Sequence, residues 1–427
     1  MSATSSLMKW IAPVVLLAGC RHEIETVVNP DAPPADRTAS WPRFHGPNGD
    51  NISTETGLLK RWPAEGPIRA WRVSGIGDGY AGVTIDDGLI YTAGNVGGRT
   101  TITALDLDGG KCWQVPNGKA WTGNYPGTRG TPTIDGGRVY HESPLGEVVC
   151  LDARTGDEIW RINILDRFRG KNPEWALAES VSIDGNHVIC CPGGPNTAVV
   201  ALDKETGETV WQSESADGDL PGYNSPVLVE HEGLRIILTM TDKALIGVGA
   251  DTGRLLFRYP HRTRYDIHAT DPIYHDGHVF ISSGYGTTGS EMLRIDAAGD
   301  RVSMEKVWGS RDLDNHHGGV ILLDGYLYGA AYGPRWICLD WETGATMYAE
   351  EGVGKGSATC AEGMLYVINE EGTVGLVKAT PDGHDVISLF QLPDDSDAKT
   401  WAHPVVCGGR LYLRRGEYLY AYDVRAE

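Results

Sequence analysis

Basic residues are scarce in this chain of 427 residues. Lys and Arg number 37 against 57 Asp and Glu, and the formal net charge at pH 7 is −20. Nucleic-acid binding depends on cationic side chains that neutralise phosphate groups, so we expect no nucleic-acid partner. Helical periodicity is missing as well, which argues against a helical architecture.

Motifs for redox and hydrolytic chemistry are also missing. The sequence contains no Cys-x-x-Cys-His motif for covalent haem, no local Ser-His-Asp spacing, no phosphate-cradling loop and no paired-carboxylate motif. These local motifs do not exclude a catalytic site formed by residues that the fold brings together from different blades. Apart from Cys20, the seven cysteines are an odd number scattered over equivalent strand positions. We therefore expect no disulfide framework.

The N-terminal apolar run, residues 10–18, is too short to cross a bilayer as a permanent helix. It follows Lys9 and leads into Leu17-Ala18-Gly19-Cys20. This segment resembles a bacterial lipoprotein signal, and the resemblance implies cleavage before Cys20, lipidation of Cys20 and, with Arg21 next, an outer-membrane destination. The alternative is an ordinary secretory signal. Residues 21–40, which contain three prolines, are then predicted to be a flexible tether.

The segment Leu151–Trp160 recurs along the chain. Its sequence, Leu-Asp-Ala-Arg-Thr-Gly-Asp-Glu-Ile-Trp, has clear copies beginning at Leu105, Leu202 and Leu339. Weaker copies contain Asp251-Thr252-Gly253, Ile295-Asp296, Leu376-Val377 and Ala421-Tyr422-Asp423. A repeat of this kind indicates a single repetitive architecture rather than two or three separate domains.

Each repeat contains four predicted strands. In the clearest unit they are residues 131–135, 138–143, 148–153 and 158–163, with glycine-containing turns between them. Eight such antiparallel blades form an all-β propeller, in which the faces of the blades are buried against one another. The last unit supplies three strands only, so we expect Ile68–Val73 to complete it and close the ring. Residues 41–427 are thus one propeller domain, with residues 41–67 packed across one face.

The repeat Leu-Asp-x-x-Thr-Gly-x-x-x-Trp resembles the blade motif of the quinoprotein, or PQQ-like, propeller superfamily. Further segments, among them Trp41-Pro42-x-Phe44-x-Gly46-Pro47 and Gly127-Thr128-Arg129-Gly130-Thr131-Pro132, are similar to exported PQQ-like propeller proteins of planctomycete-type bacteria. His45 stands where that pattern usually has Arg. The lipobox followed by eight blades also resembles the propeller lipoprotein of the outer-membrane β-barrel assembly machinery. The superfamily includes both quinone-dependent dehydrogenases and scaffolds without a cofactor, so the resemblance implies the fold more strongly than the function.

Function in a propeller is expected where the loops meet the central channel. The residues just before the inner strands are predominantly polar, charged or aromatic. They are Tyr80, Arg129, Glu179, Asn224, His268 with Asp271, His316 with His317, Lys355, and Trp401 with His403. We predict that these residues form a ligand-binding or partner-binding channel mouth, although wet loop mouths are commonly polar without any function.

Three of these residues suggest a specific alternative. Quinoprotein dehydrogenases use Glu and Asn to hold Ca²⁺ and an Asp as base, which the resemblance carries onto Glu179, Asn224 and Asp271. Against it, Cys190 and Cys191 fall within one predicted strand, where successive side chains point to opposite faces. The paired cysteines over the quinone in that family are therefore not expected here.

The sequence favours a non-catalytic binding or scaffold propeller, exported and lipid-anchored at the outer membrane. We expect no cofactor, no catalytic residue and no metal. The expected partner is an envelope protein or a small ligand at the channel mouth, and the protein is expected to be a monomer facing the periplasm. The alternative is a PQQ- and Ca²⁺-dependent dehydrogenase acting on an alcohol or sugar.

Overall fold

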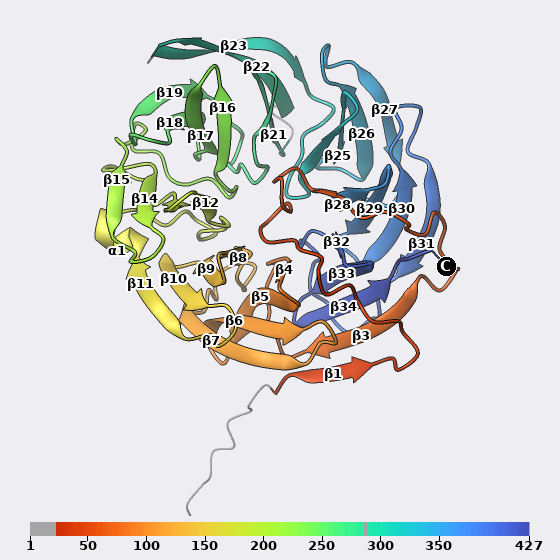
Figure 1. Ribbon diagram of the computed structural model, residues 1–427. Coiled ribbons are helices and arrows are strands. Elements are labelled where there is room, and N and C mark those ends of the chain that lie inside the picture. The colour runs from red at the N-terminus through yellow and green to blue at the C-terminus, as the bar shows by residue number, and fades with distance from the viewer. Residues whose placement is uncertain (1–22, 286–288, 300, 427) are drawn as a thin grey trace, which may run out of the picture.

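The chain folds into a ring of eight blades, each with four antiparallel strands, arranged around a common centre (Figure 1). The structure, a computed structural model, describes residues 23–285, 289–299 and 301–426. Blade 1 contains β4 (Thr84–Asp86), β5 (Leu89–Val96), β6 (Arg99–Asp106) and β7 (Lys111–Lys119), and blade 2 contains β8 (Thr133–Asp135), β9 (Arg138–Glu142), β10 (Glu147–Asp152) and β11 (Glu158–Asn163). Blade 3 contains β12 (Ser182–Asp184), β13 (His187–Cys190), β14 (Val200–Asp203) and β15 (Thr209–Gln212). Blade 4 contains β16 (Val227–His231), β17 (Leu234–Met240), β18 (Ala244–Gly249) and β19 (Leu255–Pro260).

Blades 5 to 8 continue the same plan. Blade 5 contains β20 (Ile273–His275), β21 (His278–Ser283), β22 (Gly289–Ala298) and β23 (Arg301–Ser310), and blade 6 contains β24 (Val320–Leu323), β25 (Tyr326–Ala330), β26 (Arg335–Asp340) and β27 (Thr346–Glu351). Blade 7 contains β28 (Gly356–Ala361), β29 (Met364–Asn369), β30 (Thr373–Lys378) and β31 (Val386–Gln391). Blade 8 contains β32 (Val405–Cys407), β33 (Arg410–Arg415), β34 (Tyr418–Asp423) and β3 (Ile68–Ser74). The predicted eight-bladed propeller is confirmed.

The ring is closed as predicted by the N-terminal strand β3. It pairs antiparallel with β34, with Ile68 opposite Asp423 and Val73 opposite Leu419. The outer side of β3 pairs in turn with β1 (Glu25–Val28). The prediction of a flexible tether over residues 21–40 is therefore wrong for this segment, because Glu25–Val28 is a fifth strand of blade 8 (Figure 1). The predicted lipoprotein signal and Cys20 lie outside the described residues.

The repeat motif builds a turn and docks one blade on the next. The Asp152 carboxylate accepts hydrogen bonds from the backbone N–H groups of Arg154 and Thr155 at 3.0 and 2.9 Å. The following Gly156 has a φ of +76°, a conformation that glycine adopts without strain. A Cβ atom there would lie 2.8 Å from Trp113 of the preceding blade, whose indole N–H donates to Ala153 O at 3.0 Å.

The same docking recurs around the ring. Trp160 lies against Gly207 and donates to Lys204 O at 2.9 Å, and Trp211 lies against Gly253 and donates to Ala250 O at 3.0 Å. The tryptophan at the end of a blade is thus wedged between blades, as the sequence predicted. Buried aromatic area of this size is a major part of the packing energy.

The apolar cores lie between neighbouring blades. Cys190 belongs to the core that contains Val188 and Trp160, whereas Cys191 belongs to the next core, with Ile189. The two thiols pack separately, as their adjacent positions predicted. Within the described residues, no helix is long and apolar enough to cross a membrane. The helix α1 (Ile164–Phe168) is a short turn after β11.

The N-terminal loop enters the channel. Trp41 exchanges backbone hydrogen bonds with Ile85 of β4 in blade 1, and β2 (Ile52–Ser53) pairs in parallel with β28 of blade 7. Between them the chain passes through the middle of the ring (Figure 1). Phe44 lines cavities on both sides of this segment, so the loop divides the channel into two compartments.

Candidate functional site

A cavity of about 890 Å³ occupies one end of the channel. Its wall comes from the loops that lead into the inner strands and from the turns between the second and third strands. The lining residues that carry charge or a polar ring include Tyr80, Tyr125, Arg129, Tyr223, Arg264, Tyr285, Asp314, His316, His317, Tyr332, Lys355, Glu370, Lys399, Trp401 and His403. Concave sites of this size, with aromatic walls and a few polar groups, are typical of small-molecule binding.

The structure brings together most of the predicted channel-mouth residues and separates three of them. Arg129, His316, His317, Lys355, Trp401 and His403 line the cavity. Glu179, Asn224 and His268 do not. Each is buried within its own blade and is 3%, 3% and 0% exposed, respectively.

These three residues anchor the loop to the second strand of the blade. Glu179 Oε1 accepts from Cys191 N at 2.9 Å, Asn224 Nδ2 donates to Thr239 Oγ1 at 3.1 Å, and His268 Nδ1 lies 2.6 Å from Ser283 Oγ. The residue after each anchor lines the cavity instead. These lining residues are Ser180, Ser225 and Ala269. A shift of one residue in an extended chain reverses the direction of the side chain, which is why the sequence assigned the wrong member of each pair.

A line of hydrogen bonds joins the first five blades around the channel. Thr131 N donates to Ser180 Oγ at 2.9 Å, Ser180 N to Ser225 Oγ at 3.0 Å, and Ser225 N to Asp271 Oδ1 at 2.7 Å. Gly82 N begins the line by donating to Thr131 Oγ1 at 2.9 Å. These bonds hold the inner rim of the ring at a fixed diameter.

Asp271 lies outside this cavity and lines the neighbouring compartment together with His45. Its Oδ2 lies 3.3 Å from His45 Nδ1, and His45 Nε2 lies 3.1 Å from His403 Nδ1. His403 Nε2 lies 2.9 Å from the His317 carbonyl and so must donate. A neutral His403 therefore accepts at Nδ1, and His45 donates from Nε2. Burial lowers the pKa of His403 to about 3, which keeps this imidazole neutral.

Glu370 is the centre of the charged part of the cavity. Its Oε1 accepts from His317 Nε2 at 3.1 Å and from Trp401 Nε1 at 2.9 Å, and it lies 3.2 Å from Lys355 Nζ. Burial would raise the pKa of Glu370, but the hydrogen bonds from His317 and Trp401 and the charge of Lys355 bring it well below its usual range. Glu370 is therefore an anion at neutral pH.

The sequence reasoning missed Glu370 because it considered only the residues before the inner strands. Glu370 follows β29, in the turn Asn369-Glu370-Glu371-Gly372 between the second and third strands of blade 7. Tyr285 and Tyr332 come from the equivalent turns of blades 5 and 6. The turns between the second and third strands lie at the same end of the blades as the loops before the inner strands. Considering these turns as well would have identified all three residues.

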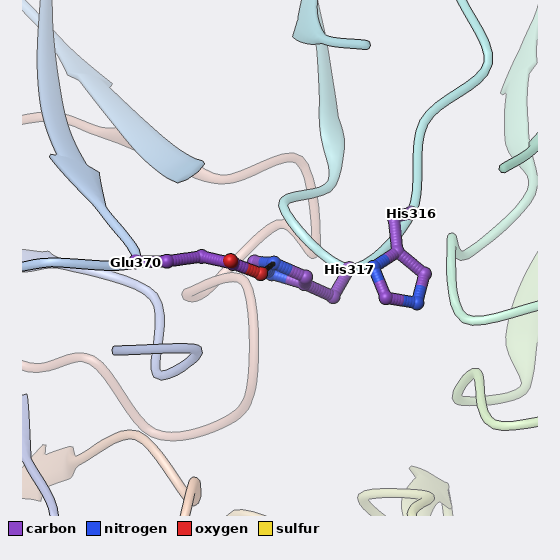
Figure 2. A group of neighbouring side chains, drawn as sticks. All are labelled: His316, His317 and Glu370. Carbon is purple, nitrogen blue, oxygen red and sulfur yellow. Dashed lines mark hydrogen bonds and ion pairs between the residues drawn. The ribbon is translucent and has the colours of Figure 1, made fainter. Parts of the chain in front are cut away.

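His316, His317 and Glu370 form a group that resembles a metal-ligand set. Figure 2 shows His317 and Glu370 pointing toward one another, with the His316 ring turned away from Glu370. Lys355 Nζ, however, lies 2.9 Å from His316 Nδ1 and 3.2 Å from Glu370 Oε1. The ammonium group thus occupies the position where a shared cation would be bound. Burial lowers the pKa of His316 well below its usual value, so His316 accepts from Lys355 as a neutral ring.

Arg129 forms the opposite wall of the cavity. Its guanidinium lies 5.5 Å from the centre of the Tyr80 ring, and Nη2 donates to Tyr125 O at 2.9 Å. The Tyr80 and Tyr125 rings in turn lie 4.7 and 4.8 Å from the Trp401 ring. This side of the cavity therefore combines a cation with a continuous aromatic surface.

The sign of the cavity charge is opposite to that of the whole chain. Its lining includes four cationic side chains, Arg129, Arg264, Lys355 and Lys399, against the two carboxylates of Asp314 and Glu370. The complete chain has a formal net charge of −20. The cavity is thus a local site for an anionic group in an otherwise acidic protein.

Glu179 and Asn224, which the quinoprotein resemblance suggested as Ca²⁺ ligands, do not form a Ca²⁺ site in the cavity wall. Glu179 is buried against Glu142, and burial together with the neighbouring carboxyl raises the pKa of Glu142 well above its usual value. One ligand atom from each of Glu142, Glu179 and Cys190 lies within 4.8 Å of the others, and all three residues are buried. Asn224 is directed into its own blade, where it donates to Thr239 of β17. These side chains do not fit a Ca²⁺ ion bound beside a ligand in the cavity.

Comparison with known proteins gives two groups of relatives. The outer membrane protein assembly factor BamB of Yersinia pestis is 22% identical over 279 residues, 63% of this chain and 68% of that protein. The polyvinylalcohol dehydrogenase of a Pseudomonas species is 32% identical over 128 residues, 26% of this chain and 17% of the dehydrogenase. The crystal structure of BamB from Moraxella catarrhalis has a TM-score of 0.58 at 16% identity and is similar over 81% of this chain and 95% of that chain.

The family pattern described as "Outer membrane protein assembly factor BamB" matches residues 98–350, from the second strand pair of blade 1 to the end of blade 6. This region is more than half of the chain and contains the clearest copies of the repeat motif. The chain therefore belongs to this family of PQQ-like propellers.

Proposed function

We propose that the chain is a non-catalytic binding propeller of the cell envelope and that the cavity is its binding site. The observation that carries the proposal is the cavity wall itself. Its imidazoles and Glu370 are hydrogen-bonded to one another, and Lys355 is held by His316 and Glu370. Such an arrangement favours a rigid recognition surface over groups that change protonation during a reaction.

The family supports an envelope scaffold. Relatives matched over most of their length are named as outer membrane protein assembly factors. We infer that this chain is lipidated at Cys20, is retained at the outer membrane and contacts another envelope protein around the cavity rim. The exposed rim tyrosines Tyr125, Tyr265 and Tyr332, which are 41–51% exposed, provide the contact area. Tyrosine is enriched at the centres of protein interfaces.

Site-specific photo-crosslinking tests this proposal. A photoreactive amino acid replaces Tyr265 on the rim, and a matched variant carries it at Ile159, an exposed residue of β11 on the outer edge of blade 2. Irradiation of intact cells should give a discrete adduct at position 265 and none of the same mass at position 159. Identical adduct patterns at both positions, or no adduct at position 265, would refute a partner at the cavity rim.

A second candidate function is suggested by the dehydrogenase match. In that reading the cavity holds PQQ with Ca²⁺, and Asp271 is the base. The geometry gives it less support, since Glu179 and Asn224 are directed into the blades and both oxygens of Asp271 already have partners. Titration of purified protein with PQQ and Ca²⁺ distinguishes the two functions. Tight binding with dye-linked alcohol oxidation, abolished in Asp271→Asn, would favour the dehydrogenase.

A further inference from the structure

Arg129 is a half-buried cation in the cavity wall. Among the described residues, no carboxylate lies within ion-pair distance of its guanidinium. The guanidinium donates to the backbone carbonyl of Tyr125 at 2.9 Å and makes a long contact to that of Gly127 at 3.5 Å. A guanidinium has more N–H donors than these two acceptors satisfy. Arg129 lines the cavity, where a bound ligand can supply further acceptors.

Arg414 shows how the same fold treats an arginine that has only a structural role. Its guanidinium is fully buried and donates to backbone carbonyls of blades 1 and 8, among them Gly77 O at 2.8 Å, Ala93 O at 2.6 Å and Gly416 O at 3.1 Å. The hydrogen-bonding capacity of Arg414 is used within the protein. Burial lowers the pKa of Arg129 in the same way, but the protein does not supply the acceptors that would compensate for the loss of water.

The surroundings of Arg129 define the rest of the ligand. Tyr80 lies under the guanidinium, and Tyr125 and Trp401 continue the wall. On the far side, Lys355 and Lys399 share Glu370. A ring-shaped, largely apolar body fits the aromatic wall, and a planar anion matches the guanidinium through two parallel hydrogen bonds. The cavity volume of about 890 Å³ suits a molecule of one to a few rings.

We propose that the cavity binds a small ring compound bearing a carboxylate, and that Arg129 pairs with this carboxylate. The proposal rests on the cavity being a binding site, as proposed above. Two sources share this chemistry, an aromatic acid and an acidic sugar. Both present a planar carboxylate beside a ring, and the cationic balance of the lining favours either over its neutral analogue.

The test uses purified full-length protein and isothermal titration calorimetry. The probes are 2-naphthoate with its neutral partner 2-naphthalenemethanol, and D-glucuronate with its neutral partner D-glucose. At least one acid should bind more tightly than its neutral partner, and the affinity should fall as NaCl is raised. Tight binding of 2-naphthoate identifies the aromatic acid, and tight binding of glucuronate identifies the acidic sugar.

Arg129→Gln should weaken binding of the acid by about 10- to 100-fold, the range expected for a charge-assisted hydrogen-bonded pair, and leave the neutral analogue unchanged. Arg129→Lys should restore part of the affinity by restoring the charge. The matched control is Arg154→Gln, since Arg154 is exposed and pairs with Asp87 away from the cavity. It should leave the affinity unchanged.

Equal affinity for an acid and its neutral partner, or equal loss in the Arg129 and Arg154 variants, would overturn the proposal. Failure of both acids to bind would overturn it as well. The salt dependence of the wild-type protein gives the same answer if Arg129→Gln fails to fold. A rim crosslink at position 265 in the absence of acid binding would leave the envelope-binding function standing and remove only the carboxylate ligand; absence of both would remove the two together.

Discussion

Docking of tryptophan on glycine gives a prediction whose size follows from the geometry. At Gly207, a Cβ atom would lie 2.8 Å from two ring atoms of Trp160, and φ is +71°. Gly185, a turn glycine of the same blade, has a φ of +57° and no atom within 4 Å of its Cβ position. Gly207→Ala therefore combines backbone strain with a steric clash, whereas Gly185→Ala introduces backbone strain alone.

The left-handed conformation costs an alanine about 1–2 kcal/mol, and overpacking of a well-filled contact costs about 1–3 kcal/mol more. We expect Gly185→Ala to lower the free energy of unfolding by about 1–2 kcal/mol and Gly207→Ala by about 2–5 kcal/mol. In a Trp160→Ala background the clash is absent. The loss caused by Gly207→Ala should then fall to that of Gly185→Ala.

Urea denaturation followed by circular dichroism gives these free energies for the single and double variants, and the double-mutant cycle isolates the contact between Gly207 and Trp160. Equal losses for the two glycine variants would refute the reasoning. So would a Gly207→Ala loss that is unchanged without the Trp160 ring, because either result would mean that the glycine serves its own turn and not the docking of the next blade.

Three further outcomes are expected. Burial lowers the pKa of His141 to about 4. Since an unfolded histidine titrates near pH 6.5, the free energy of unfolding should fall by about 1.4 kcal/mol for each unit that the pH is lowered between about pH 6.5 and 4. Urea titrations of His141→Gln should lack this contribution to the pH dependence. Glu370→Gln should lower the free energy of unfolding by about 1–3 kcal/mol near neutral pH. Because the folded-state pKa of Glu370 is depressed, the difference from wild type should disappear as the pH falls below the ordinary carboxyl range. A difference that persists at low pH would contradict the ion-pair explanation. Cys20→Ser should move the protein from the membrane pellet to the soluble fraction on carbonate extraction, and undiminished retention would argue against a lipid anchor.

The sequence predicted the fold well because each blade is specified locally. The Asp-x-x-Thr-Gly turn satisfies its own backbone groups, and the tryptophan four residues later reaches the next copy of the turn. The closing strand was visible because Trp71 occupies the tryptophan position of a fourth strand. The strand Glu25–Val28 was missed because proline content was given more weight than the β-branched run Thr26-Val27-Val28.

The site was predicted less completely because it depends on direction and on distant segments. Glu179 and Ser180 are neighbours in sequence, yet one anchors the blade and the other lines the cavity. A one-residue difference of this kind depends on backbone direction, which composition does not specify. Phe44 reaches the cavity, and His45 reaches His403 in its wall, only because the N-terminal loop enters the channel. No local pattern indicates these long-range contacts.

The closure of blade 8 also has a consequence for how the molecule is assembled. Ile68 pairs with Asp423, so β3 cannot join its blade until almost the whole chain is available. The ring is consequently completed by its most non-local pairing, and such contacts form slowly because the chain between them must be ordered first. Once formed, the seam makes the two ends of the propeller neighbours, and a molecule built from sequential repeats gains the cooperativity of a closed circle.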